Sequence, residues 1–181
     1  RGETVETYGD FDACLTDYSK LGLTGLAVDS LAALNQWVAY KVTGAERMPV
    51  IDRNNPNNEW GDLHREMHNF AMRMRRTAKY VIATCPSDKS VNQITGRTAI
   101  TPDLPGREAC GSAGWFDFVG YLSAEPTGPG KIKRTVDFRP NSQIIVRQRI
   151  PIGKSIVNLI TLPDGTGSWA VIKDIIVKSA T

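Results

Sequence analysis

The sequence predicts an α/β protein with a mainly parallel sheet, and two apolar runs carry that prediction. The first run, Leu23–Val28, is followed at once by Asp29, Ser30 and a helical pattern. The second, Lys79–Cys85, follows a long amphipathic pattern and ends at Pro86. The order strand, helix, loop, helix, strand is typical of a βαβ crossover, which pairs its strands in parallel.

Three segments have the apolar spacing of helices. The first starts near Asp10 and stops at Gly22, and the second starts at Ser30 and fades by about Gly44. The third runs from Trp60 to Arg76, with apolar residues at steps of three and four. Its outer face carries several arginines, which fit either a solvated surface or contact with phosphates.

The second half of the chain is predicted to be a long loop followed by β structure. Residues 86–113 lack periodicity, and a loop of that length is usually functional or mobile. The strands predicted after it are Trp115–Leu122, Lys133–Arg139, Gln143–Ile150, Ile156–Leu162 and Trp169–Val177. The second and third of these are expected to pair antiparallel across Pro140 and Asn141.

Composition narrows the class of protein. The 181 residues suffice for one domain with a sizeable core, and 41% hydrophobic and 23% charged residues are ordinary for a globular protein. A net charge of +3 permits an anionic partner without demanding one. Three scattered cysteines without CxxC spacing favour free thiols in a reducing compartment. No run approaches membrane-spanning length, and no signal peptide is visible.

Asp29 is the central candidate site residue. An acid directly after a buried strand lies at the carboxyl edge of a sheet, where α/β proteins bind ligands. In nucleotide hydrolases an acid so placed holds Mg²⁺ beside the phosphates. The competing interpretation is that Asp29 caps the helix that follows.

Two other motifs are weak. His64 and His68 share a helix face, but Arg65 stands where the metalloprotease motif needs Glu, so two surface histidines are the better interpretation. The run Ile152–Ser155 resembles the end of a phosphate-binding loop. Its opening glycine is missing, however, and the residues after it favour a strand rather than the required helix.

Arg147 and Arg149 alternate on one predicted strand, so both guanidinium groups lie on one face and Gln148 on the other. They fit either exposed edge-strand charges or arginine fingers that reach a neighbouring subunit's phosphates.

Taken together, the segments resemble the phage RecA-like ATPases of the Sak single-strand-annealing type, within the RecA-like P-loop class. The resemblance covers about residues 10–150. Its segments, in the family's order, are Leu26–Leu31 as the Walker B strand, Trp60-Gly61 with the following helix, Tyr80–Thr84, Pro102–Gly106, Phe116–Val119 and Arg147–Arg149.

The resemblance implies a RecA-like core over residues 1–150 and a β-rich antiparallel extension over 151–181. It implies that Asp29 holds Mg²⁺ with support from Ser30, and that Thr84 senses the γ-phosphate of ATP. Arg147 and Arg149 would act on the adjacent protomer's nucleotide. The residues implied as DNA phosphate contacts are Lys89, Arg97 and Arg107.

The sequence departs from this family in two respects. Pro86 stands two residues past Thr84, where the family often has a His, and the more serious departure concerns the Walker A segment. The Walker A strand, loop and helix belong before residue 10, where only nine residues stand. Three explanations remain: the chain is the later part of a longer protein, another segment fills the gap, or ATPase function has been lost.

The expected function is therefore ATP binding in phage DNA recombination or single-strand annealing, with Mg²⁺-dependent hydrolysis completed between subunits. The chain is a candidate ATPase, and single-stranded DNA and further copies of the chain are its expected partners. No membrane is expected, and the expected compartment is the host cytoplasm. The alternatives are a non-hydrolysing module that binds nucleic acid or protein, and a structural component of a viral particle.

Overall fold

The computed structural model describes residues 8–50, 58–91, 96–105, 108–139, 142–149, 158–163 and 168–180. The chain divides into two compact units. The first comprises residues 1–87 and 103–109, and the second comprises 88–102 and 110–181.

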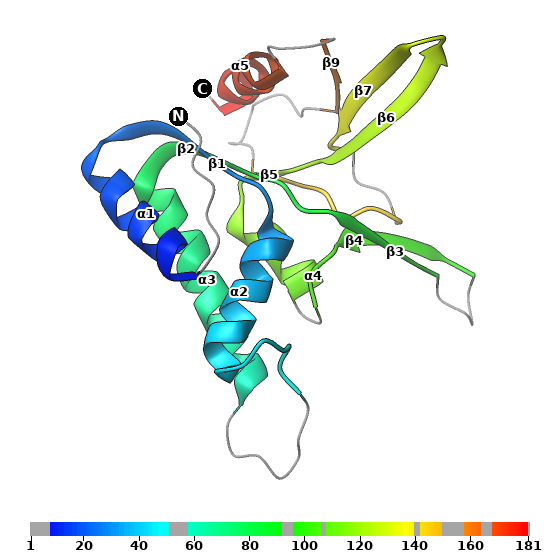
Figure 1. The fold of residues 1–181 in the computed structure, drawn as a ribbon. Helices are drawn as coiled ribbons and strands as arrows, with labels where there is room; N and C mark the ends of the chain where they lie inside the picture. The colour runs from blue at the N-terminus through cyan, green and yellow to red at the C-terminus, as the bar shows by residue number, and fades with distance from the viewer. Residues whose placement is uncertain are drawn as a thin grey trace. The chain divides into compact units, whose positions relative to one another are not determined.

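The first unit is built from three helices and two parallel strands (Figure 1). Their bounds are α1 Tyr8–Lys20, β1 Leu23–Val28, α2 Leu31–Thr43, α3 Glu59–Thr77 and β2 Ala78–Ala83. The three helices lie on the same side of β1 and β2. The helices and both strands match the sequence predictions, because each has a local periodic pattern and a recognisable end.

The core of the first unit lies between the helices. Phe70 and Met67 of α3 and Leu34 and Val38 of α2 are all at most 2% exposed. The ring of Phe11 in α1 packs against that of Phe70, with centroids 5.4 Å apart. These residues recur at helical spacing, so burying one stripe of each helix fixes the three against each other.

Polar contacts also join the helices of the first unit and cap one of them. Arg73 of α3 forms an ion pair with Asp12 of α1. Asn58 caps α3 through a hydrogen bond from the amide of Gly61 (3.0 Å). The exposed ion pair contributes little stability but joins two helices far apart in sequence.

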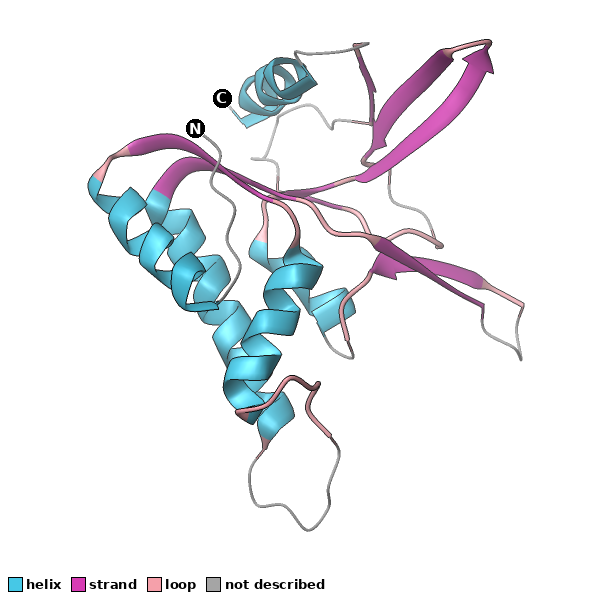
Figure 2. Cartoon of the chain, in the orientation of Figure 1, coloured by secondary structure: helices cyan, strands magenta, loops and turns pink. Residues whose placement is uncertain are grey.

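The second unit consists mainly of short strands. The elements that follow β2 in the chain are β3 Ser87–Val91, β4 Thr98–Pro102, α4 Glu108–Gly111, η1 Ser112–Trp115, β5 Phe118–Val119, β6 Tyr121–Gly128, β7 Lys131–Asp137, β8 Arg147–Gln148, β9 Leu159–Leu162 and α5 Ser168–Ala180. Helix α4 begins in the residues of the first unit. Strand β3 pairs with β4, β5 with β8, and β7 lies between β6 and β9. Helix α5 lies beside β9 (Figure 2).

The core of the second unit forms between β7, β9 and α5. Val136 and Phe138 join Ile160 and Leu162 in a buried cluster. Val171, Ile172 and Ile175 of α5 pack against this cluster. The spacing of these three residues, one and then three positions apart, suits one face of a helix.

The predicted RecA-like core with a mainly parallel sheet is wrong. Among the described residues, β1 and β2 form a two-stranded parallel sheet, whereas β5–β8, β6–β7 and β7–β9 pair antiparallel. The reason is that a short apolar run does not specify which strand it pairs with. The described strands after β2 pair with one another in small sheets and add no strand to the sheet of β1 and β2.

Several element predictions in the second half are also wrong. Trp169–Val177, predicted as a strand, lies in α5, and the predicted loop 86–113 contains β3, β4 and α4. Strand β7 pairs with β6 and β9 instead of pairing across Pro140 and Asn141. Strand β9 lies within the predicted Ile156–Leu162 segment.

Candidate functional site at the carboxyl edge of β1 and β2

Asp29 and Thr84 lie opposite each other, directly after the two parallel strands. Val28 is aligned with Ala83, so the next residue of each strand continues the same register. The amide of Thr84 donates to the carbonyl of Val28 (3.0 Å), and its carbonyl accepts from the amide of Leu31 (2.8 Å). The hydroxyl of Thr84 donates to Oδ1 of Asp29. The predicted position of Asp29 at the rim of a parallel pair is therefore confirmed.

Ser30 is the N-cap of α2. Its Oγ accepts a hydrogen bond from the amide of Ala33 (3.4 Å), which satisfies one of the free donors at the helix start. Because Ser30 fills this position, Asp29 is not needed as the cap. The Asp29 side chain is exposed and keeps its carboxylate at the strand edge.

This edge offers one carboxylate and one hydroxyl, which fits magnesium better than a transition metal. Mg²⁺ is typically bound by one or two carboxylates, several waters and the phosphates of a substrate. In the part of the chain that the structure describes, no group of three or more His, Cys, Asp or Glu residues could hold a metal unaided. A cation at Asp29 would therefore take its other oxygen ligands from water and from a bound phosphate.

Arg147 and Arg149 lie together in the second unit, on the same side of β8. The guanidinium of Arg149 donates to the carbonyl of Gly114 (3.0 Å) and forms an ion pair with Asp117 (3.2 Å). A Cβ added at Gly114 would lie 3.6 Å from Nη1 of Arg147. Gln148 donates instead to the carbonyl of Phe138 (3.0 Å), as strand alternation predicts. Arg149 is thus anchored within its own chain.

Two of the three predicted DNA contacts, Lys89 and Arg97, lie around β3 and β4. Lys89 is an exposed residue of β3, and Arg97 is exposed just before β4 begins. Arg107 and the loop candidate Ile152–Ser155 lie outside the described residues. His64 and His68 are exposed on α3, as the surface interpretation predicts.

Asn35 is a candidate site residue that the sequence prediction missed. It is 3% exposed, and its Nδ2 has no hydrogen-bond acceptor among the described residues. It lines a pocket of about 600 Å³ beside α2. The signal was present in the sequence, because Leu31, Leu34, Asn35 and Val38 form one helical stripe with an amide among apolar side chains.

Arg47, which lines this pocket, forms an ion pair with Glu59. The guanidinium of Arg47 binds both carboxylate oxygens of Glu59, at 3.0 and 2.8 Å. The hydrogen bond from Arg47 lowers the pKa of Glu59, and the same bond raises the pKa of Arg47. This contact holds the segment after α2 against the start of α3.

Cys85 follows Thr84 but is not suited to nucleophilic chemistry. Burial raises the pKa of its thiol, so the reactive thiolate is disfavoured at neutral pH. Its Sγ lies 4.0 Å from the carbonyl oxygen of Asp103. Neither Cys14 nor Cys85 forms a disulfide bond.

Comparisons of the chain with protein-family models, with curated proteins and with solved structures found no match. By its fold, the described part of the chain is a mixed helix and strand protein with one parallel strand pair and several small antiparallel pairs. The resemblance to phage recombination ATPases stays a prediction. Among the described helices, none combines the length and the apolar character needed to cross a membrane.

Proposed function

We propose that the protein binds the magnesium complex of ATP at the carboxyl edge of β1 and β2. The observation that carries this proposal is the contact between the Thr84 hydroxyl and the Asp29 carboxylate, at the aligned ends of two parallel strands. Asp29 would bind Mg²⁺ directly or through water, and Thr84 would orient the carboxylate.

Hydrolysis is proposed to be completed between copies of the chain. Phosphoryl transfer to water depends mainly on positioned positive charge, and an arginine supplied from a neighbouring subunit can provide it. Arg147 is the better candidate of the two arginines, because Arg149 already forms an ion pair with Asp117.

The proposal includes single-stranded DNA as a partner. Its support is the exposure of Lys89 and Arg97, whose positive charges suit a phosphate backbone. Binding of a labelled oligonucleotide, followed by fluorescence anisotropy, should weaken steeply as salt rises. Cys14 and Cys85 form no disulfide bond, which suits action in the reducing cytoplasm of a host cell.

The decisive experiment compares Asp29→Ala with the wild type in titrations with a non-hydrolysable ATP analogue and Mg²⁺. The variant should lose at least tenfold in affinity for the complex, because removal of the carboxylate leaves the metal without its protein ligand. Asp17→Ala is the matched control, since it removes one exposed carboxylate from α1 and should bind as the wild type does. Equal, negligible binding by the wild type and Asp29→Ala would instead favour a non-hydrolysing binding module.

A further inference from the structure

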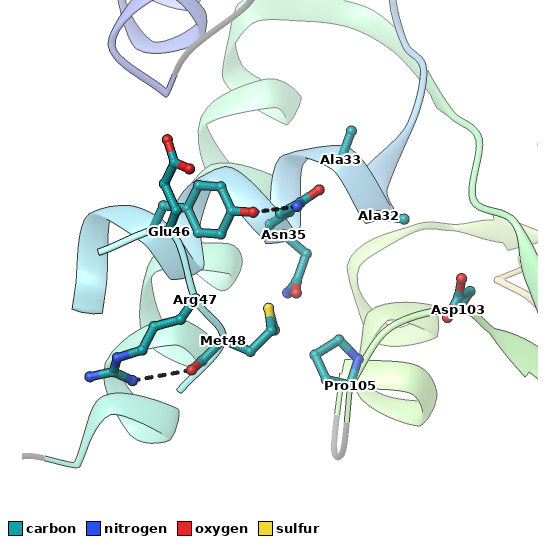
Figure 3. Close-up of a pocket in the computed structure, with 10 residues that line it drawn as sticks. Ala32, Ala33, Asn35, Glu46, Arg47, Met48, Asp103 and Pro105 are labelled. Carbon is teal, nitrogen blue, oxygen red and sulfur yellow. Dashed lines mark hydrogen bonds between the residues drawn. The ribbon is translucent and has the colours of Figure 1, made fainter. Parts of the chain in front are cut away.

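A pocket of about 600 Å³ lies in the first unit, along the side of α2 (Figure 3). Ala32 and Ala33 line it at the start of the helix, and Tyr40 lines it at the far end. Met48 and Pro105 come from the segments on either side. Its size is in the range of small-molecule sites, which are typically about 300–1,000 Å³.

Asn35 supplies the pocket with a polar group that the fold does not use. Its side chain is directed toward Met48 and Pro105. The Nδ2 donor is buried and has no acceptor in the described part of the chain, which is costly for a buried polar group. The terminal torsion of asparagine is broad, so the amide can turn to present this donor to a ligand.

The charges around the pocket disfavour an anion. Glu46 and Asp103 both line it. The guanidinium of Arg47 is held by Glu59 and is directed away from Pro105. A neutral ligand whose amino group donates to a carboxylate suits this lining better than a phosphate does.

The pocket begins close to the proposed metal ligand. Ala33, at one end, donates its amide to Ser30, the residue after Asp29. Asp103, on the opposite wall, donates its amide to the carbonyl of Pro86 (2.7 Å), two residues after Thr84. Asn35 is the fifth residue of α2, a rise of about 6 Å from Leu31, and Asp29 stands two residues before the helix begins.

We propose that this pocket binds the base of the nucleotide, as a neutral planar heteroaromatic ring with an exocyclic amino group, such as adenine. The inference rests on the proposed function for the position of the phosphates, and it adds the base to that site. Asn35 would donate to a ring nitrogen, the carboxylate of Asp103 or Glu46 would accept from the amino group, and the Met48 thioether would contact the ring.

The test uses three probes with the 181-residue chain: adenosine, the Mg²⁺ complex of tripolyphosphate, and the Mg²⁺ complex of a non-hydrolysable ATP analogue. Asn35→Leu removes the donor while keeping a similar side-chain size. It should weaken the binding of adenosine and of the ATP analogue by about tenfold, the loss of one good hydrogen bond, and leave tripolyphosphate binding unchanged. Asn69→Leu is the control, because Asn69 is an exposed amide on α3.

The outcomes separate the two proposals. If adenosine fails to bind the wild type, or binds Asn35→Leu equally well, the base pocket is refuted whatever Asp29→Ala does. If Asp29→Ala leaves tripolyphosphate binding unchanged while adenosine still depends on Asn35, the metal site fails and the base pocket stands. Should Asn35→Leu not fold, Met48→Ala changes the partly exposed wall of the pocket and should weaken adenosine binding several-fold.

Discussion

Replacement of Thr84 by valine separates the chemistry of the site from its architecture. Valine keeps the branched shape of threonine and removes only the hydroxyl that donates to Asp29. The backbone contacts of Thr84 with Val28 and Leu31, at 3.0 and 2.8 Å, do not involve the side chain and should persist. The variant therefore tests the Thr84–Asp29 contact without dismantling the strand edge.

The expected loss of stability in Thr84→Val depends on how exposed the Thr84 and Asp29 side chains are. Both side chains are exposed, so the lost hydrogen bond should cost about 0.5–1 kcal/mol, at the low end of measured values. For a chain of 181 residues this lowers Tm by about 1–4 °C. The effect on Mg²⁺-dependent nucleotide binding should be larger, about 10–100-fold, because the carboxylate loses the group that orients it.

The assay is calorimetric titration of the ATP analogue with and without Mg²⁺, paired with urea unfolding. Thr84→Ser is the matched control, since it retains the hydroxyl and should bind within about threefold of the wild type. Binding by Thr84→Val within twofold of the wild type, in the presence of Mg²⁺, would refute the reasoning. A destabilisation above about 3 kcal/mol would show that the contact supports the fold rather than the site.

The remaining predictions concern packing and pH. Gly120→Ala should lower the free energy of unfolding by about 1–3 kcal/mol, because the added Cβ would lie 2.6 Å from Cγ1 of Val136. Gly128→Ala, which has no atom within 4 Å of the added Cβ, should change it by less than about 0.5 kcal/mol in the same urea titration; equal effects would contradict the packing argument. The pKa of Glu59 in the folded state is lower than its ordinary value of 4.5, chiefly because of the hydrogen bond from Arg47. Ionised Glu59 therefore stabilises the fold at neutral pH, and this stabilisation is lost as the pH falls below 4.5 and through the pKa of the folded state. The difference in Tm between Glu59→Gln and the wild type should therefore be largest at neutral pH and should shrink as the pH falls below 4.5, which thermal unfolding over a series of pH values measures.

Local patterns predicted the first unit well. The apolar stripe of α3 and the capped start of α2 depend on residues a few positions apart, which is the range of helical hydrogen bonds. The crossover pattern correctly predicted that β1 and β2 pair in parallel. From that pairing the position of Asp29 beside Thr84 follows, because both residues come directly after aligned strands.

Helix α5 illustrates why the second unit was harder to predict. Residues 169–177 are rich in isoleucine and valine, which favour strands. In the folded protein, Val171, Ile172 and Ile175 pack as one helical face on the cluster around Val136. Tertiary packing thus overrides local propensity, and the cluster that decides it is assembled from β7 and β9, earlier in the chain.

The sequence by itself determined the helices of the first unit, its two parallel strands, and the acid and hydroxyl that directly follow those strands. Only the tertiary structure decided which later strands pair, in which direction, and that Nδ2 of Asn35 is buried beside a pocket with no acceptor among the described residues. The physical reason is the separation along the chain of the residues that must come into contact. A helix closes its hydrogen bonds within four residues, whereas a sheet and a pocket are completed by segments that the chain brings together only when it folds.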